Sequence, residues 1–305
     1  MLGWIANGCS QTPSGGTLSA TAKGEAPRNR MSAPGMELET WFDSNIGRVR
    51  KSNQDTVGCF SDAALFVVAD GMGGHADGEV ASRLATEVIH ARFIASSPAT
   101  AAADKPESTE SFWRLAFGWL RRPASDEDGD AVRLRLAIEA ANRRVYEEGQ
   151  ARVATERGSM GTTVVALQCS LPRRRASWAY VGDSRLYRAR AGRLMLLTAD
   201  HTLYGEPYRQ QSEIPSDLPH TNRLARAVGV GREVEVSTGA DRLERGDVYL
   251  LCSDGVSGMI AAGEIEAELN SGRALAEIGE ALISKALDAG GKDNASVLLV
   301  RVRDA

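Results

Sequence analysis

The sequence predicts an α+β fold in which two antiparallel β-sheets pack face to face and helices cover their outer faces. Two observations lead to this prediction. Short apolar runs rich in Val, Leu and Tyr, which are typical of buried strands, recur along the chain beyond residue 36. Helical periodicity comes in pairs of segments rather than once between successive strands, which excludes a simple βαβ repeat and favours a layered sandwich. With 305 residues the chain is long enough to bury a sizeable core.

The N-terminal residues 1–36 differ in composition from the rest of the chain. They are rich in Gly, Ser, Thr, Ala and Pro and show no hydrophobic period. This composition predicts a disordered lead-in. The folded domain is expected to span residues 37–303, and residues 37–69 to form short strands separated by turns.

Two helices are expected next, with an unusual insert between them. Residues 77–94 carry apolar side chains at close to helical spacing, with Asp77 as the N-cap, and residues 130–149 show the same pattern. The insert, residues 96–129, holds two Trp and two Phe within a few positions. It is either a short helix that covers part of the core or a docking helix for a partner or a membrane surface.

The second half of the chain is again rich in strands. A flap-like loop with three prolines is expected at residues 200–220, and two helices at residues 262–270 and 273–289. The expected strands are residues 163–168, 176–181, 186–188, 194–197, 233–237, 247–252 and 295–300.

An aspartate lies at four of the junctions between these strands and loops: Asp70, Asp183, Asp254 and Asp293. An unpaired buried charge costs several kcal/mol or more, so four such groups at the ends of core strands are explained if they converge on cations. Ligands that are all oxygen suit Mg²⁺ and Mn²⁺ better than Zn²⁺. The alternative is that each aspartate forms a turn or caps a helix.

Six motifs, four of which contain these aspartates, occur in a characteristic order. They are RKSNQD at 50–55, DGMGGH at 70–75, GTT at 161–163, VGDSR at 181–185, LCSDG at 251–255 and GKDNAS at 291–296. In this order they resemble the bacterial branch of the metal-dependent Ser/Thr protein phosphatases of type 2C. The resemblance covers residues 37–302, and the fold it implies is a four-layer αββα sandwich.

The resemblance implies a site for two catalytic Mn²⁺ or Mg²⁺ ions that activate a bridging water. Asp70 is expected to bridge the two ions and the Gly71 carbonyl to bind the second, because a bare backbone lets a carbonyl approach an ion closely. Asp254 and Asp293 are expected to complete the coordination of the first ion. Asp183, with Asp254, matches a weaker third metal site, and the alternative for Asp183 is a tight hairpin turn.

Other positions of the family pattern imply supporting roles. Arg50 matches the arginine that holds the substrate phosphate, for which a planar guanidinium is suited. Asp55 is expected to orient Arg50 or a metal-bound water, and Asn294 to hold the last metal loop. Thr162 and Thr163 are interpreted as buried strand residues rather than nucleophiles.

The general acid is not assigned by these motifs. Eukaryotic relatives place a histidine directly after the Asp-Gly pair, whereas this chain has Met72 there. His75 and His201 are candidates because histidine titrates in the right range, and a metal-bound water is a third.

Composition narrows the class of protein. A net charge of −4 and a pI near 5.7 argue against a nucleic-acid binder. Three of the four scattered cysteines lie in apolar surroundings, which predicts small buried side chains in a reducing compartment rather than disulfides or metal ligands. With no apolar run of about 18 residues and no signal peptide, we expect a cytoplasmic monomer without a membrane span.

The expected function is hydrolysis of phosphoserine and phosphothreonine in proteins. Its partners would be phosphorylated proteins and a bacterial Ser/Thr kinase that the enzyme opposes, and kinship also allows a link to type VI secretion. The alternatives are a catalytically silent scaffold of the same fold and a phosphatase for a small phosphoester. The scaffold is disfavoured because every metal carboxylate and the phosphate arginine are present.

Overall fold

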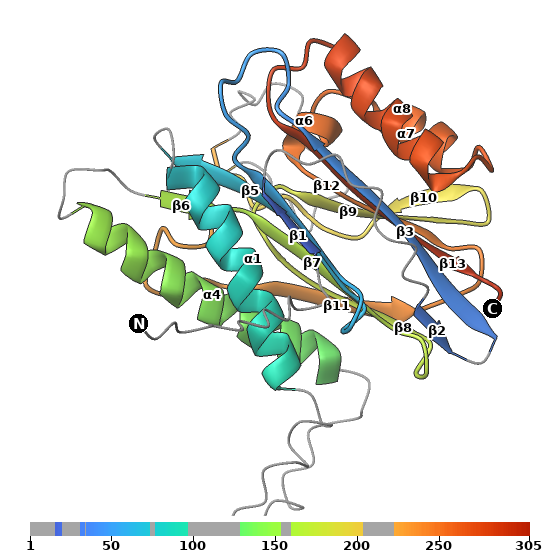
Figure 1. Cartoon of the computed structure of the whole chain (residues 1–305), viewed down its shortest axis with the longest axis horizontal. Coiled ribbons are helices and arrows are strands. Elements are labelled where there is room, and N and C mark those ends of the chain that lie inside the picture. The colour runs from blue at the N-terminus through green and yellow to red at the C-terminus, as the bar shows by residue number, and fades with distance from the viewer. Residues whose placement is uncertain are drawn as a thin grey trace, which may run out of the picture.

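The computed structural model describes residues 16–19, 31–33, 35–73, 77–96, 129–153, 160–203 and 223–305. Two antiparallel sheets lie at its centre, with one pair of long helices over the first sheet and two further helices over the second (Figure 1). The first pair is α1 (Asp77–Ala95) and α4 (Gly129–Val153), and the second is α7 (Ala262–Leu269) and α8 (Leu275–Asp288). The predicted four-layer αββα sandwich is confirmed.

The first sheet follows the order β1-β4-β5-β7-β8-β11, and β6 extends it by pairing with the end of β5. All of its pairs are antiparallel. The strands are β1 (Gly16–Ser19), β4 (Asp55–Phe60), β5 (Leu65–Gly73), β6 (Met160–Thr162), β7 (Val164–Ser170), β8 (Arg175–Val181) and β11 (Ser237–Arg242).

The second sheet follows the order β10-β9-β12-β13-β3-β2, also with antiparallel pairs. The strands are β2 (Met31–Ala33), β3 (Met36–Asn45), β9 (Arg185–Arg190), β10 (Arg193–Leu196), β12 (Val248–Cys252) and β13 (Ala295–Arg303). A one-turn helix, α6 (Asp254–Ser257), follows β12 almost directly.

Three hydrophobic layers separate the four structural layers. Phe66, Tyr180 and Tyr249 belong to the layer between the sheets. Ile89 and Ile138 fill the layer under α1 and α4, and Ile278 and Leu282 fill the layer under α8. Each central strand is therefore buried on both faces, which explains why these strands read as continuous apolar runs rather than as alternating patterns.

Several expected elements differ from the observed ones. Strand β5 does not stop before Asp70 but continues to Gly73, because its end pairs with β6. The strand expected at residues 233–237 is wrong, since β11 begins only at Ser237. The alternating pattern there arises because Val234 and Val236 pack against the core under α1 and α4 without joining a ladder.

The start of α1 also differs from the expectation. Asp77 is the first residue of the helix rather than its N-cap. Its Oδ1 accepts a hydrogen bond from Nη1 of Arg152 at 2.8 Å, so it links α1 to α4.

The expected disorder of residues 1–36 is wrong for two segments. Strand β1 pairs with β4 and strand β2 pairs with β3, so each adds an edge strand to one sheet. Short strands of this kind are held by main-chain hydrogen bonds to a sheet that forms without them, which composition does not reveal. Cys9, residues 97–128 of the insert and residues 204–222 of the flap-like loop lie outside the described residues.

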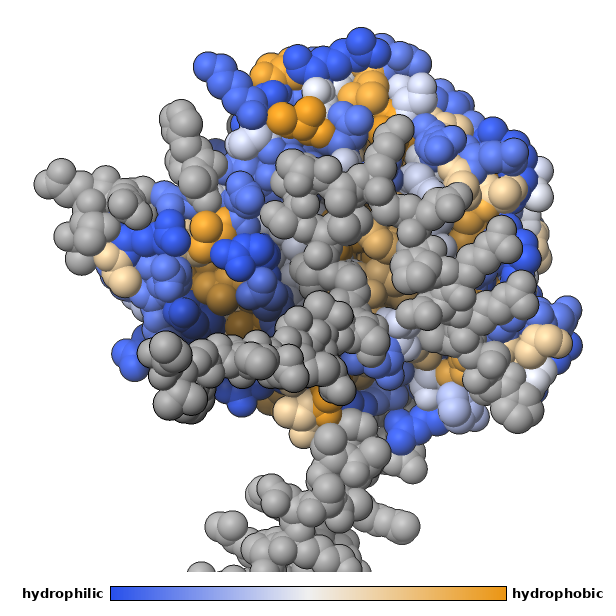
Figure 2. Space-filling model, in the orientation of Figure 1, coloured by the Kyte–Doolittle hydropathy of each residue, from blue (hydrophilic) through white to orange (hydrophobic). Residues whose placement is uncertain are grey.

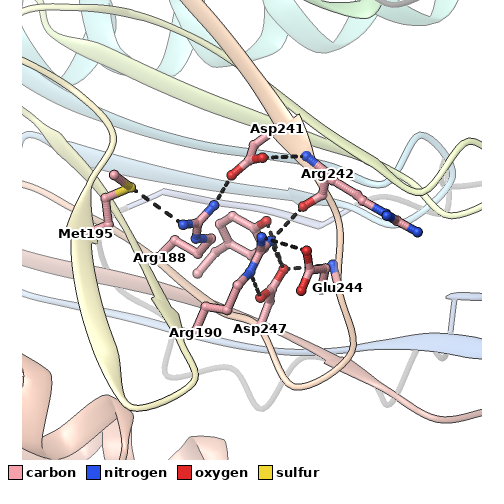
Figure 3. Close-up of polar contacts among 8 residues, drawn as sticks. Arg188, Arg190, Met195, Asp241, Arg242, Glu244 and Asp247 are labelled. Carbon is pink, nitrogen blue, oxygen red and sulfur yellow. Dashed lines mark hydrogen bonds and ion pairs between the residues drawn. The ribbon is translucent and has the colours of Figure 1, made fainter.

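A buried ionic network ties the two sheets together at one end (Figure 3). Asp247 is fully buried, and its two oxygens accept hydrogen bonds from Nε and Nη2 of Arg190 at 2.6 and 2.7 Å. Arg190 also reaches Glu244 and the carbonyl of Arg242. Because β9 and β11 belong to different sheets, these contacts join the sheets by charge-assisted hydrogen bonds.

The cysteines that the structure describes agree with the expectation that they are small buried side chains. Cys59, Cys169 and Cys252 are buried and carry free thiols, as expected of small hydrophobic side chains. Figure 2 shows a face on which hydrophilic residues predominate and hydrophobic residues lie in separate patches. Among the helices of the described ranges, none combines the length and apolar character needed to cross a membrane.

Candidate active site

A pocket of about 420 Å³ lies where the aspartate-bearing strands and loops meet. Side chains from both sheets contribute to it, so the sandwich brings together residues far apart in sequence. Its lining includes Arg50, Gln54, Asp70, Gly71, Met72, Thr163, Asp183, Asp254 and Asp293. All four aspartates singled out from the sequence therefore border one cavity.

Asp70 and Gly71 are held near the end of β5 by main-chain contacts. The N–H of Asp70 donates to Oγ1 of Thr163 at 3.1 Å, and the carbonyl of Asp70 accepts from Oγ1 of Thr162 at 2.9 Å. Both threonines are buried, as expected, and they fix the backbone of Asp70. A Cβ at Gly71 would collide with the carbonyls of Gly78 and Gln54, so this glycine is required for β5 to pack closely against α1 and against the residue that precedes β4.

Asp254 and Asp293 come from two touching loops of the second sheet. Asp254 is the first residue of α6, and Asp293 directly precedes Asn294 at the start of β13. A Cβ at Gly255 would collide with the carbonyl of Asn294, which shows how closely the two loops approach. The amide of Asn294 donates to the carbonyls of Ile46 and Ser52, and so fastens this loop to the one that carries Arg50.

Asp183 lies where the chain crosses between the sheets. It follows β8 of the first sheet and precedes β9 of the second. The alternative of a tight hairpin turn is therefore wrong, because β8 and β9 do not pair. Asp183 also borders a second, adjoining pocket of about 310 Å³ together with Asp254 and Asp293.

The carboxyl groups of this cluster strongly perturb one another. Burial raises the pKa of Asp70 well above its usual range, and the charges of Asp55 and Asp254 add to the effect. Burial and the charge of Asp293 raise the pKa of Asp254, while a hydrogen bond with Asp70 opposes the rise. Burial and Asp254 raise the pKa of Asp183 to about 7. Positive charge bound among these carboxylates would offset their mutual repulsion.

Asp55 lies directly opposite Asp70 across the β4–β5 pair. It is fully buried, and its Oδ2 accepts hydrogen bonds from Oγ of Ser253 at 2.8 Å and Oγ of Ser296 at 2.6 Å. Burial raises the pKa of Asp55 to about 7, although these two hydrogen bonds work against the rise. Asp55 thus links the strand of Asp70 to residues adjacent to Asp254 and Asp293.

Arg50 lies on the rim of the pocket and is about half exposed. Its Nη2 lies 2.6 Å from Oδ2 of Asp293. This hydrogen bond is the main cause that raises the pKa of Arg50, which keeps the guanidinium charged. Four of the five N–H donors of an arginine remain for other acceptors after one such bond.

The residues present fit a divalent cation site by their chemistry. Oδ1 of Asp254 and Oδ1 of Asp55 are buried and accept no hydrogen bond within the part of the chain that the structure describes. The donors are all oxygen, the preference of hard cations. No three carboxylate, histidine or cysteine side chains of the described residues already converge at coordinating distance, and one oxygen of Asp293 is engaged by Arg50.

Comparison with known proteins places this geometry in a family. A family described as "Protein phosphatase 2C" matches residues 47–295, which is most of the chain. The chain belongs to the protein phosphatase 2C family. Its relatives include the serine/threonine phosphatase stp of Listeria monocytogenes, 34% identical over 265 residues, a stretch that covers 85% of this chain and 94% of the relative.

Solved structures of protein phosphatase 2C type share the fold. One is PppA of Pseudomonas aeruginosa, described as a key regulatory component of T6SS, with 30% identity, a TM-score of 0.66 and coverage of 87% of this chain and 97% of that one. Another is the catalytic domain of PstP in complex with two manganese ions, with 30% identity, a TM-score of 0.65 and coverage of 88% and 100%.

The two histidine candidates of this protein phosphatase 2C chain have different outcomes. His201 is fully buried, its Nδ1 accepts from the N–H of Gly182 at 3.2 Å, and its Nε2 lies 3.0 Å from Oγ of Ser237. A histidine enclosed in this way has no path to a substrate, so His201 is structural. His75 lies outside the described residues.

Sequence reasoning missed one side of the pocket. The stretch from Arg223 to Val230 contributes several residues to the lining, including Arg226. It carries none of the aspartates, and it follows the proline-containing loop in which no element was expected. The two arginines three positions apart were the available signal.

Proposed function

We propose that the pocket around Asp70 is the active site with which this chain, a metal-dependent protein-serine/threonine phosphatase, removes phosphate from phosphoserine and phosphothreonine. The observation that carries the proposal is the convergence of Asp70, Asp183, Asp254 and Asp293 on one cavity with Arg50 at its rim. Four partly buried carboxylates around one cavity repel one another, and bound cations would offset that repulsion.

Divalent cations would be held by Asp70, Gly71, Asp254 and Asp293, with Asp183 and Asp254 at a weaker third position. Bound there, the cations supply positive charge that neutralises a phosphate dianion and activates water as a nucleophile. The raised pKa of Asp70 supports this assignment, because its cause is burial together with neighbouring negative charge. Either Mn²⁺ or Mg²⁺ fits ligands that are all oxygen.

The roles of the surrounding residues follow from their contacts. Arg50 holds the substrate phosphate through donors not used by Asp293, since a guanidinium fork matches two phosphate oxygens. Asp55 keeps the strand of Asp70 in register with the loops of Asp254 and Asp293 through Ser253 and Ser296. No protein side chain is proposed as the general acid.

The substrates are phosphorylated proteins, and we propose that a Ser/Thr kinase of the same cell supplies them. We further propose that the enzyme works as a monomer in the cytoplasm. The free thiols of Cys59, Cys169 and Cys252 support a reducing compartment.

Hydrolysis of a phosphothreonine peptide with and without Mn²⁺ tests the proposal. The purified chain is expected to release phosphate only with added Mn²⁺ or Mg²⁺, and EDTA is expected to abolish the activity. Asp288→Asn, which changes an exposed carboxylate that does not line the pocket, serves as the control and should behave like the unaltered chain. Full activity after dialysis against EDTA would refute the metal-dependent mechanism.

A further inference from the structure

One wall of the pocket is formed by residues 223–230, which line the same cavity as the aspartates. We call this segment the 223–230 wall. It contributes Arg223, Leu224, Ala225, Arg226, Ala227 and Val230 to the lining. The wall belongs to neither sheet and contains none of the residues proposed to hold metal or phosphate.

Main-chain hydrogen bonds hold the wall in place along its length. The carbonyl of Arg223 accepts from the N–H of Leu203 at 2.9 Å, and the N–H of Ala225 donates to the carbonyl of His201 at 2.8 Å. Val228 exchanges two hydrogen bonds of 2.9 Å with Thr162, one of the two threonines that fix the backbone of Asp70. The wall is therefore anchored to the same framework as the aspartates, so side chains on it keep a defined place relative to them.

The three arginines that line the pocket differ in how their charges are used. Arg50 pairs with Asp293 at 2.6 Å, and Arg226 pairs with Glu235 at 3.1 Å. Arg223 is exposed, and no carboxylate of the described residues pairs with it. A cation that lines a pocket, is held by its backbone and is not paired with a carboxylate of the described residues is suited to bind an anion from outside.

We propose that Arg223 binds a carboxylate of the substrate chain close to the phosphorylated residue, so that the enzyme prefers acidic phosphopeptides. The inference rests on the proposed phosphatase function. The phosphate itself is drawn to the aspartate side of the pocket through Arg50 and bound cations. A glutamate or aspartate a few residues away then meets Arg223 on the 223–230 wall, where a guanidinium fork forms charge-assisted hydrogen bonds with a carboxylate.

Apolar neighbours of Arg223 support a peptide as the occupant. Leu224 lines the pocket, and the side chain of Val230 on the same wall is 62% exposed. A polypeptide offers both apolar and acidic side chains at short spacing, whereas a small phosphoester would leave this wall unused. The 223–230 wall therefore contacts the residues beside the phosphorylated one, which differ between substrates. The aspartate cluster acts on the phosphate, which every substrate has.

The test compares phosphothreonine peptides that differ in one side chain. In a series of peptides, a single Glu is placed at each position in turn, from four residues before to four residues after the phosphothreonine. Each peptide has a partner with Gln at the same position. Initial rates with Mn²⁺ give kcat/KM for the wild type, Arg223→Gln, Arg223→Lys and Arg232→Gln. Arg232 is the matched control, because it is an exposed arginine just beyond the wall and does not line the pocket.

At the best position the wild type is expected to prefer Glu over Gln by about three- to tenfold in kcat/KM, which lies around the upper end of what an exposed ion pair contributes. Arg223→Gln is expected to reduce this ratio to about one. Arg223→Lys should keep part of the preference and Arg232→Gln all of it. Because the ratio is taken within each variant, a loss of folded protein does not imitate the result.

Three outcomes decide between the proposals. Equal rates on Glu and Gln peptides at every position in the wild type overturn the role of Arg223 and leave the phosphatase function standing. A preference that survives in Arg223→Gln, or that disappears equally in Arg232→Gln, also overturns it. Absence of hydrolysis of every peptide with Mn²⁺ refutes the phosphatase function itself.

Discussion

Replacing Asp183 by Asn is expected to stabilise the protein in EDTA at alkaline pH but not at acidic pH. Burial, followed by the charges of Asp254 and Asp200, raises the pKa of Asp183 from the ordinary 3.8 to about 7. The folded protein therefore holds this proton more tightly than the unfolded chain. Its contribution to stability is fully present below the unfolded pKa and is lost as pH rises through about 7.

The size of the effect follows from that shift. A change of about three pKa units corresponds to about 4 kcal/mol once Asp183 is fully ionised in both states. Asp183 is partly accessible to water, and relaxation and water penetration reduce such penalties, so Asn is expected to recover about 1–3 kcal/mol at pH 8. For a chain of this size that is a rise in Tm of about 2–6 °C.

Thermal melts in EDTA at pH 4.5 and pH 8 measure this difference for the wild type, Asp183→Asn and Asp288→Asn. Asp288 is the control because its side chain is 71% exposed and pairs with Arg48 at the surface, so its loss should matter little. Added Mn²⁺ should raise the Tm of the wild type more than that of Asp183→Asn. An equal gain in Tm at both pH values, or none at pH 8, would contradict the reasoning.

Three further changes probe other parts of the molecule. Arg50→Ala should raise KM for a phosphopeptide more than it lowers kcat, because phosphate is held in ground and transition states alike; steady-state kinetics with both parameters unchanged would remove Arg50 from the site. Asp254→Asn should lower kcat at saturating Mn²⁺ by at least about 10²-fold, and a loss of less than threefold would argue against a metal ligand. Arg190→Ala should cost about 3 kcal/mol of unfolding free energy, because Asp247 stays buried without its partner; a denaturation midpoint equal to that of the wild type would show that the network in Figure 3 is dispensable.

Features set by local pattern were predictable from the sequence. A strand buried on both faces must be apolar whatever its partners are, so apolar runs such as the one before Asp254 predict strands. The helices α1 and α4 match segments with helical spacing of apolar residues, and α7 and α8 match the two helices expected before the last strand. The aspartates at the strand ends were recognised as a group because their motifs recur in a fixed order.

Pairing and enclosure were decided only by the tertiary structure. Residues 233–237 alternate like a strand, yet nothing in their own sequence says whether a neighbouring strand is present to pair with them. His201 reads as a titratable candidate, and only the elements packed around it reveal that it is enclosed. Arg223 lies 31 residues from the nearest of the four aspartates, Asp254, so only the packing that anchors the 223–230 wall reveals that they share a cavity.

The sequence by itself therefore determined the architecture, the family and the chemical character of the site, since these depend on residue types and their order. The tertiary structure decided which carboxylates perturb one another, which histidine is enclosed and which arginine faces the pocket without a carboxylate partner among the described residues. Those properties depend on distances and on burial, and both arise from contacts between segments whose separation along the chain carries no information about their separation in space.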